Sequence, residues 1–189
     1  LKIREATGNL FEGKLKLEGK VTTSNKNSQY QTQFTLNRMN LPLALRALED
    51  KTLKSGTLDL TGNYHTKGRS VADLVSHLNG SGSFSFNGVD ISSRTKRGSA
   101  FSSISILLSS LNKFAGVIGG KGGSEKAKLH GLFQVVNGIA KFKNTNLTSG
   151  IGSGTAKGVI DFPNWRLDAT GTLNLSQNVL MQALMEQAG

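Results

Sequence analysis

Apolar and polar side chains alternate along most of the chain, a pattern that predicts strands buried on one side only. In residues 13–23, Leu15, Leu17 and Val21 alternate with three lysines and a glutamate. Asn137-Gly138 has the composition of a hairpin turn between two further strands. Because the same alternation recurs, we expect many short strands, including residues 30–36, 55–68 and 81–88.

Four segments change to the helical period instead. In residues 40–50, Leu41, Leu45 and Leu48 share one helical face, and Pro42 falls in the first turn, where proline is tolerated. The other three predicted helices cover residues 71–78, 99–115 and about 177–188.

The helix predicted at residues 71–78 has its own start signal. Ser70 followed by Asp73 resembles a capping box, in which each side chain bonds the other residue's backbone N–H. We expect the apolar face of this helix to shield a patch of sheet; its members are Val71, Leu74, Val75 and Leu78.

Glycine is abundant, with 23 residues, whereas there are only two prolines. This composition is typical of strands joined by tight turns, where positive φ angles recur. We expect Gly80 and Gly82 to reverse the chain into the next strand, and Asn87-Gly88 to form another hairpin turn. The glycine-rich residues 116–125 are predicted to form a flexible loop.

The two ends of the chain resemble each other. Each runs from a glycine-flanked strand through a second strand with Thr-Leu-Asn into a short helix containing Ala-Leu. Such repeats favour an elongated stacked or wound sheet. Residues 1–189 are predicted to form a single domain of the α+β class, mainly β. We expect a twisted, mostly antiparallel sheet with three to four short amphipathic helices, either with a closed core or as an open curled sheet with an apolar groove.

Residue types that carry catalysis or bind metal ions are scattered. His65, His77 and His130 lack metal-ligand spacing, and there is no cysteine to form a disulfide or a thiolate site. Residues 119–123 do not match a phosphate-binding loop, and no serine lies in a nucleophile elbow. We therefore predict a protein that is not an enzyme and that uses no metal or cofactor.

The chain has a net charge of +11, concentrated between residues 88 and 158, where ten basic residues oppose two acidic ones. A field of this sign favours phospholipid headgroups, lipopolysaccharide phosphates or nucleic acid, and is equally typical of a solvated face. The lysines are dispersed along strands, and the phenylalanines lack the consensus of an RNA-stacking sheet. We therefore do not expect nucleic acid as a partner.

One motif of spaced residues runs from Ser55 to Ile91, and a second runs from Gly131 to Ala140. Together with the pattern around them, which covers nearly the whole chain, the two motifs resemble the C-terminal region of the AsmA family of bacterial envelope proteins. The helix at residues 40–50 also matches one that the family places before its first motif. The residues that match the two motifs are Ser55, Gly56, Leu58, Leu60, Gly68, Ser70, Leu74, Leu78, Gly80, Gly82, Gly88 and Ile91, followed by Gly131, Phe133, Val135, Asn137, Gly138 and Ala140.

This resemblance implies a β-rich periplasmic protein of Gram-negative bacteria, tethered to the inner membrane by an N-terminal helix outside this sequence. The family is similar to bridge-like lipid carriers and is associated with outer-membrane biogenesis. It implies that phospholipid, or another anionic envelope lipid, is conveyed along an apolar β groove between the inner and outer membranes. The alternative is a scaffold module that binds envelope assembly proteins, assists outer-membrane assembly and binds no lipid.

Two sets of candidate contact residues follow. Acyl chains would be buried at roughly 0.8 kcal/mol per CH2 against the apolar side of each strand. The candidates for anionic headgroups or a docking partner are Arg94, Lys96, Arg97 and Lys121. The candidate lipid-binding wall comprises Leu15, Leu17, Leu58, Leu60, Phe84, Phe86, Phe133, Val135, Ile160, Leu173 and Leu175.

Overall fold

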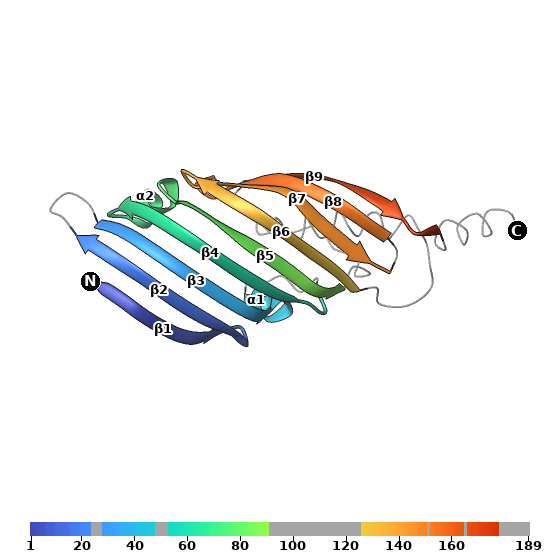
Figure 1. Ribbon diagram of the computed structural model, residues 1–189, viewed down its shortest axis with the longest axis horizontal. Helices are drawn as coiled ribbons and strands as arrows, with labels where there is room; N and C mark the ends of the chain where they lie inside the picture. The colour runs from blue at the N-terminus through green and yellow to red at the C-terminus, as the bar shows by residue number, and fades with distance from the viewer. Residues whose placement is uncertain (24–27, 48–52, 91–125, 151, 165, 178–189) are drawn as a thin grey trace, which may run out of the picture.

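The computed structural model describes residues 1–23, 28–47, 53–90, 126–150, 152–164 and 166–177. In this part of the chain there are nine strands and two helices (Figure 1). In chain order they are β1 (Lys2–Leu10), β2 (Gly13–Thr23), β3 (Ser28–Asn40), α1 (Leu41–Ala47), β4 (Thr57–Gly68), α2 (Val71–Ser76), β5 (Asn79–Asp90), β6 (Lys126–Val136), β7 (Ile139–Ser149), β8 (Gly152–Asp161) and β9 (Arg166–Leu175).

The nine strands form one sheet in which each strand pairs antiparallel with its neighbours in sequence. The sheet is open, with β1 and β9 at its two edges, and Figure 1 shows it as a long twisted ribbon of strands. The prediction of a mainly β, antiparallel fold is therefore confirmed, and the sheet is the open one of the two arrangements.

Every second strand from β1 to β7 carries a bulge. The ladder shifts by one residue in β1, β3, β5 and β7. Three of these bulges contain a residue with positive φ, namely Arg38 (56°), Gly88 (64°) and Asn144 (52°). Because a bulge increases the local right-handed twist, the series helps the sheet to twist along its length.

Two turn predictions near residue 80 are wrong. Gly80 and Gly82 lie inside β5, where they pair with Tyr64 and Gly62 of β4. Asn87-Gly88 forms the bulge of β5, because the strand continues beyond it and pairs again with β6. By contrast, Asn137-Gly138 is the predicted hairpin turn, with φ angles of 49° and 76°.

Helix α1 begins and packs as predicted. The Asn40 side chain accepts a hydrogen bond from the Leu43 N–H (3.2 Å), which caps the helix. Leu41 and Leu45 are 1% and 3% exposed, so one face of α1 is fully buried.

Helix α2 has the predicted start but not the predicted burial. The Asp73 N–H donates to the Ser70 Oγ (3.1 Å), and the Ser70 N–H donates to the Asp73 carboxylate (3.2 Å), which confirms the capping box. However, α2 has no buried residue, and Val71 is 78% exposed. Including Val71 in the shielding face was therefore wrong. Leu74, by contrast, is half-buried, and its carbonyl accepts a hydrogen bond from the Thr66 hydroxyl of β4 (2.6 Å).

Strand β1 was not predicted, because almost all its residues are exposed and show no alternation. It joins β2 through Phe11 and Glu12, both with positive φ (45° and 65°), although neither is a usual residue for such a turn. The Asn40 N–H donates to the Phe11 carbonyl (2.8 Å), and its side-chain amide donates to Glu12 (2.7 Å). These contacts with the start of α1 hold the turn.

Three predicted segments lie outside the described residues. They are the helix at 99–115, the loop at 116–125 and all but the first residue of the helix near 177–188.

Candidate functional site

The strand ladders place the predicted wall residues on one face of the sheet. Residues directly opposite each other in neighbouring strands have their side chains on the same face. One such row runs from Leu15 through Leu36 and Leu60 to Phe84. The register places the following predicted residues on this apolar face: Leu15, Leu17, Leu58, Leu60, Phe84, Phe86, Phe133, Val135, Ile160 and Leu175. The backbone of Leu173 pairs with Gly154, and its side chain lies outside the described part.

The apolar face includes residues that were not chosen as wall candidates. Phe34 pairs with Leu17, and Phe142 pairs with Phe133. Tyr64 lies between them on β4. Their alternation is visible in the sequence, but single strands do not show which residues meet across the ladder.

Aromatic rings form a continuous series across five strands of this face. The Phe34 and Tyr64 rings stack with centroids 5.2 Å apart, and Tyr64 stacks on Phe133 at 6.2 Å. Phe133 stacks on Phe84 at 6.4 Å, and Phe84 meets Phe142 edge-on at 6.2 Å. The series crosses β3, β4, β5, β6 and β7, so aromatic rings cover this part of the apolar face.

Glycines on the neighbouring strands make room for these rings. A Cβ on Gly82 would lie 2.6 Å from Cζ of Phe133, and a Cβ on Gly131 would lie 2.9 Å from Cζ of Phe84. In the ladder the two pairs are reciprocal, because Gly82 faces Phe133 and Phe84 faces Gly131. Each ring therefore lies over the backbone of a glycine on the neighbouring strand, where no side chain occupies the space.

One end of the apolar face is sealed as a core. Leu41 and Leu45 of α1 form one buried cluster with residues of β4 to β7, and Leu53 joins it. Figure 1 shows α1 and α2 at opposite ends of the strands. The predicted wall residues in this cluster are Leu58 and Phe86. We therefore assign these two residues to the core under α1.

The rest of the wall is more accessible. Leu15, Leu17 and Phe133 are half-buried, as are Ile160 and Leu175, whereas Val135 is buried. Leu60 and Phe84 are also half-buried and pack against the edge of the α1 cluster. Because α2 buries none of its residues, it does not close its end of the sheet as α1 does.

Two of the polar groups on the apolar face, Tyr64 and Thr145, lie among its aromatic and core residues. Burial raises the pKa of the Tyr64 phenol to about 12, so this side chain is neutral. The Thr145 hydroxyl is fully buried without a hydrogen-bond partner, next to the position where Gly131 lacks a side chain. Neither group is charged at neutral pH.

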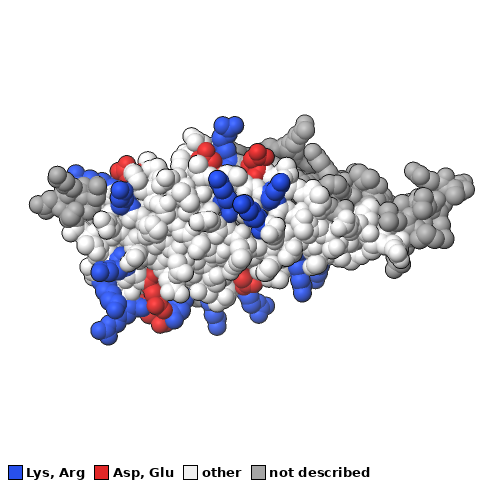
Figure 2. Space-filling view, turned by 45° about the horizontal axis from the view of Figure 1, so that its top comes forward, with Lys and Arg blue, Asp and Glu red and all other residues white. Residues whose placement is uncertain are grey.

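The opposite face of the sheet is polar and contains many lysines. Lys16 pairs with Thr35 in the ladder, and its ammonium lies 3.1 Å from Glu18 and 3.3 Å from Glu5. Hydrogen bonds to Glu18, and then to Glu5, raise the pKa of Lys16. Figure 2 shows Lys and Arg side chains in separate groups, one near the middle of the view and others towards its lower left. In the ladders of β1 to β9, the paired charged residues all lie on this polar face.

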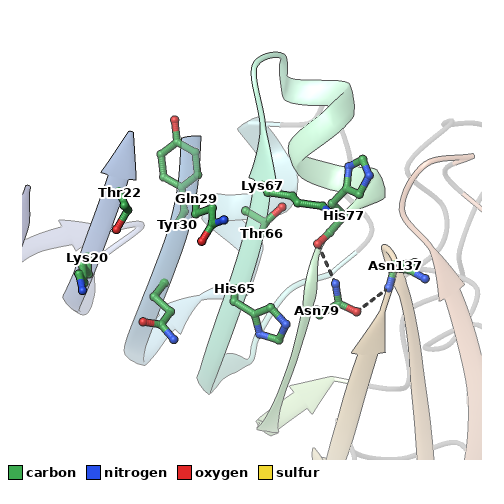
Figure 3. Close-up of a pocket in the computed structure, with 11 residues that line it drawn as sticks. Lys20, Thr22, Gln29, Tyr30, His65, Thr66, Lys67, His77, Asn79 and Asn137 are labelled. Carbon is green, nitrogen blue, oxygen red and sulfur yellow. Dashed lines mark hydrogen bonds between the residues drawn. The ribbon is translucent and has the colours of Figure 1, made fainter. Parts of the chain in front are cut away.

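A hollow of about 660 Å³ lies at one end of β2 to β4, with mostly polar-face side chains around it (Figure 3). Its lining includes Lys20, Lys67, Gln29 and His65, and no carboxylate. On its far side the Asn137 N–H donates to Asn79 Oδ1 (3.0 Å), a bond drawn in Figure 3. This hollow suits a polar or anionic ligand and not an acyl chain.

The predicted headgroup contacts Arg94, Lys96, Arg97 and Lys121 lie outside the described residues. Within the described ranges, no group of three or more His, Asp or Glu side chains could hold a metal ion. No helix there is long and apolar enough to span a membrane.

A scan against protein-family models, a search of curated proteins and a search of solved structures each found no match to this chain.

Proposed function

We propose that the protein binds phospholipid with the acyl chains against the apolar face of the open sheet. In this proposal it is a non-enzymatic, AsmA-like protein of the periplasm that conveys lipid between the inner and outer membranes. The observation that supports it is the separation of apolar and charged residues onto opposite faces of the sheet. The ladders of β1 to β9 place no Asp, Glu, Lys or Arg on the apolar face.

The dimensions of the face suit an acyl chain. Nine strands spaced by about 4.8 Å give it a width of about 38 Å. One acyl chain spans half of a bilayer core of roughly 30 Å, or about 15 Å, so the face is about 2.5 times as wide as one chain is long. A lipid tail lying across the strands would contact the ring series without leaving the apolar surface.

Contact with a tail would remove water from both surfaces. Each CH2 that moves from water onto the face contributes roughly 0.8 kcal/mol at full burial. Half-buried residues such as Leu17 and Phe133 have apolar surface left to cover, whereas Leu58 and Phe86 have almost none. In this proposal the lipid therefore lies against the half-buried residues of β1 to β6 that are outside the cluster sealed by α1.

The second candidate is a scaffold that binds an envelope assembly protein and no lipid. The sealed cluster under α1 favours it, because a face already closed at one end leaves less room for continuous transport. The two candidates differ in whether the purified protein contains lipid.

Native mass spectrometry of the protein purified from a Gram-negative host distinguishes them. We expect adducts with phospholipid masses that are released on unfolding. Leu17→Gln should lower the lipid-bound fraction by about tenfold, since an unpaired amide beside acyl chains costs roughly 1–3 kcal/mol. Thr35→Gln is the matched control on the opposite face, since Thr35 pairs with Lys16, and it should have no effect. A folded, lipid-free wild-type protein would contradict the proposal and favour the scaffold.

A further inference from the structure

Three large apolar side chains are exposed on the polar face of the sheet. Leu132 is 66% exposed, Val136 51% and Ile139 36%. Val136 and Ile139 pair with each other across the β6–β7 hairpin, and Leu132 lies on the same face of β6, about 13 Å further along the strand. Val159 of β8 adds a half-buried aliphatic side chain opposite Lys141 on the same face, so the hairpin end of this face carries an apolar surface that suits a partner.

Lysines lie directly beside these side chains. Leu132 pairs with Lys143, and the neighbouring Gln134 pairs with Lys141. Within the described residues, neither lysine forms an ion pair. We call the surface formed by Leu132, Val136, Ile139, Lys141 and Lys143 the hairpin patch.

The charges around the hairpin patch are mainly positive. Two carboxylates are near, because Asp161 pairs with Ile139 and Asp168 pairs with Val159 of β8. Asp161 already accepts hydrogen bonds from the backbone N–H (3.1 Å) and side-chain amide (2.9 Å) of Asn164. The strands around the patch supply further cations, namely Lys128, Lys157 and Arg166.

The hairpin that carries the patch is held in place. The Gly138 N–H donates to the Leu78 carbonyl after α2 (2.8 Å), and the Phe162 N–H donates to the Gly138 carbonyl (3.0 Å). The turn is therefore tied to α2 on one side and to the end of β8 on the other. A surface fixed in this way loses little conformational entropy when a partner binds.

We propose that the hairpin patch docks the protein on an anionic membrane surface. The aliphatic side chains enter the boundary between headgroups and acyl chains, while Lys141 and Lys143 contact lipid phosphates. Lysine is depleted in the cores of protein–protein interfaces, so its interleaving with exposed aliphatics favours a lipid surface over a protein partner. The proposal does not depend on lipid binding by the apolar face, because the patch lies on the opposite face.

Co-sedimentation with vesicles tests this docking. We expect binding to vesicles of phosphatidylcholine mixed with phosphatidylglycerol, little binding to phosphatidylcholine alone, and loss of binding at 1 M salt, where the Debye length is about 3 Å. Lys141→Gln with Lys143→Gln should weaken binding by about 25-fold, or fivefold per lysine at roughly 1 kcal/mol each. Leu132→Gln should also weaken it.

The matched control variants remove lysines and an aliphatic side chain at positions outside the hairpin patch. Lys2→Gln with Lys14→Gln removes two exposed lysines of β1 and β2, and Val71→Gln removes an exposed aliphatic of α2. Both should bind vesicles like the wild type. Absent binding, or equal loss in the controls and the patch variants, would overturn the docking proposal. Vesicle binding by a protein that contains no phospholipid would support docking and overturn only the proposed lipid carriage.

Discussion

Glycines and aromatic rings occupy complementary positions on neighbouring strands of the apolar face. Gly82 faces Phe133 and Gly131 faces Phe84, so each ring lies where its partner strand has no side chain. The sequence shows the alternation of Phe84 and Phe86 and so predicts the face of each residue. It does not show the pairing, which depends on the register between β5 and β6, two strands separated in the chain by residues 91–125. For this reason Gly82 was assigned to a turn when its role is to accommodate a ring.

Replacing Gly82 with alanine should therefore destabilise the protein. The new Cβ would lie 2.6 Å from Cζ of Phe133 and closer still to the backbone carbonyl oxygen of Thr61 in β4, and such overpacking costs roughly 1–3 kcal/mol. Gly8→Ala is the control, because a Cβ on Gly8 has no atom within 4 Å and alanine suits a strand better than glycine. Urea unfolding should show a lower free energy of unfolding for Gly82→Ala alone. Equal stability of the two variants would contradict the close packing of Phe133 and the Thr61 backbone around Gly82.

The two described helices perform different tasks at the two ends of the strands. α1 closes the core through Leu41 and Leu45, whereas α2 is fixed by hydrogen bonds at its start and buries nothing. Both helices could be predicted from apolar spacing and capping residues. The extent of their burial could not be predicted. For α2 it depends on where the end of β4 places the helix relative to the sheet. The same limit applies to Asn87-Gly88 and Asn137-Gly138, since both dipeptides adopt positive φ at glycine and only the continued pairing of β5 makes the first one a bulge.

At the element scale, Leu45→Ala should lower the free energy of unfolding by about 2–5 kcal/mol, as expected when a buried leucine is truncated. Val71→Ala in α2 should change it by less than about 0.5 kcal/mol, because Val71 is mostly exposed. Urea unfolding of both variants measures the difference. Similar losses for the two would show that α2 seals the sheet after all.

The capping box makes α2 sensitive to acid. The backbone N–H of Arg69, the Ser70 hydroxyl and the Ser70 N–H lower the pKa of Asp73. Their stabilising effect is therefore complete above the ordinary aspartate pKa of about 3.9 and is lost as the pH falls through the lower value of the folded protein. Amide exchange of α2, followed by NMR, should accelerate as the pH falls through that range, after correction for the intrinsic pH dependence. Asp73→Asn keeps an acceptor without the charge, so in this variant the corrected rate should not change there.

As a whole, the molecule is an open sheet with one apolar and one polar face. This segregation follows from period-two alternation, and the sequence predicted it for the strands from β2 onwards. The bulges limited the prediction, because Leu36 and Met39 lie on one face although they are three residues apart. A pattern of strict alternation would put Leu36 and Met39 on opposite faces, so it cannot reveal a bulge between them. The apolar face supports lipid carriage, and the hairpin patch on the opposite face supports docking to a membrane.

Site-specific photocrosslinking distinguishes a protein that carries phospholipid on its apolar face from one that does not. Phe34 and Gln33 are neighbours on β3 whose side chains point to opposite faces. A photoreactive benzoylphenylalanine at position 34 should capture phospholipid on irradiation in Gram-negative cells, and the same group at position 33 should not. Equal capture at both positions, or capture of protein alone at position 34, would contradict the account.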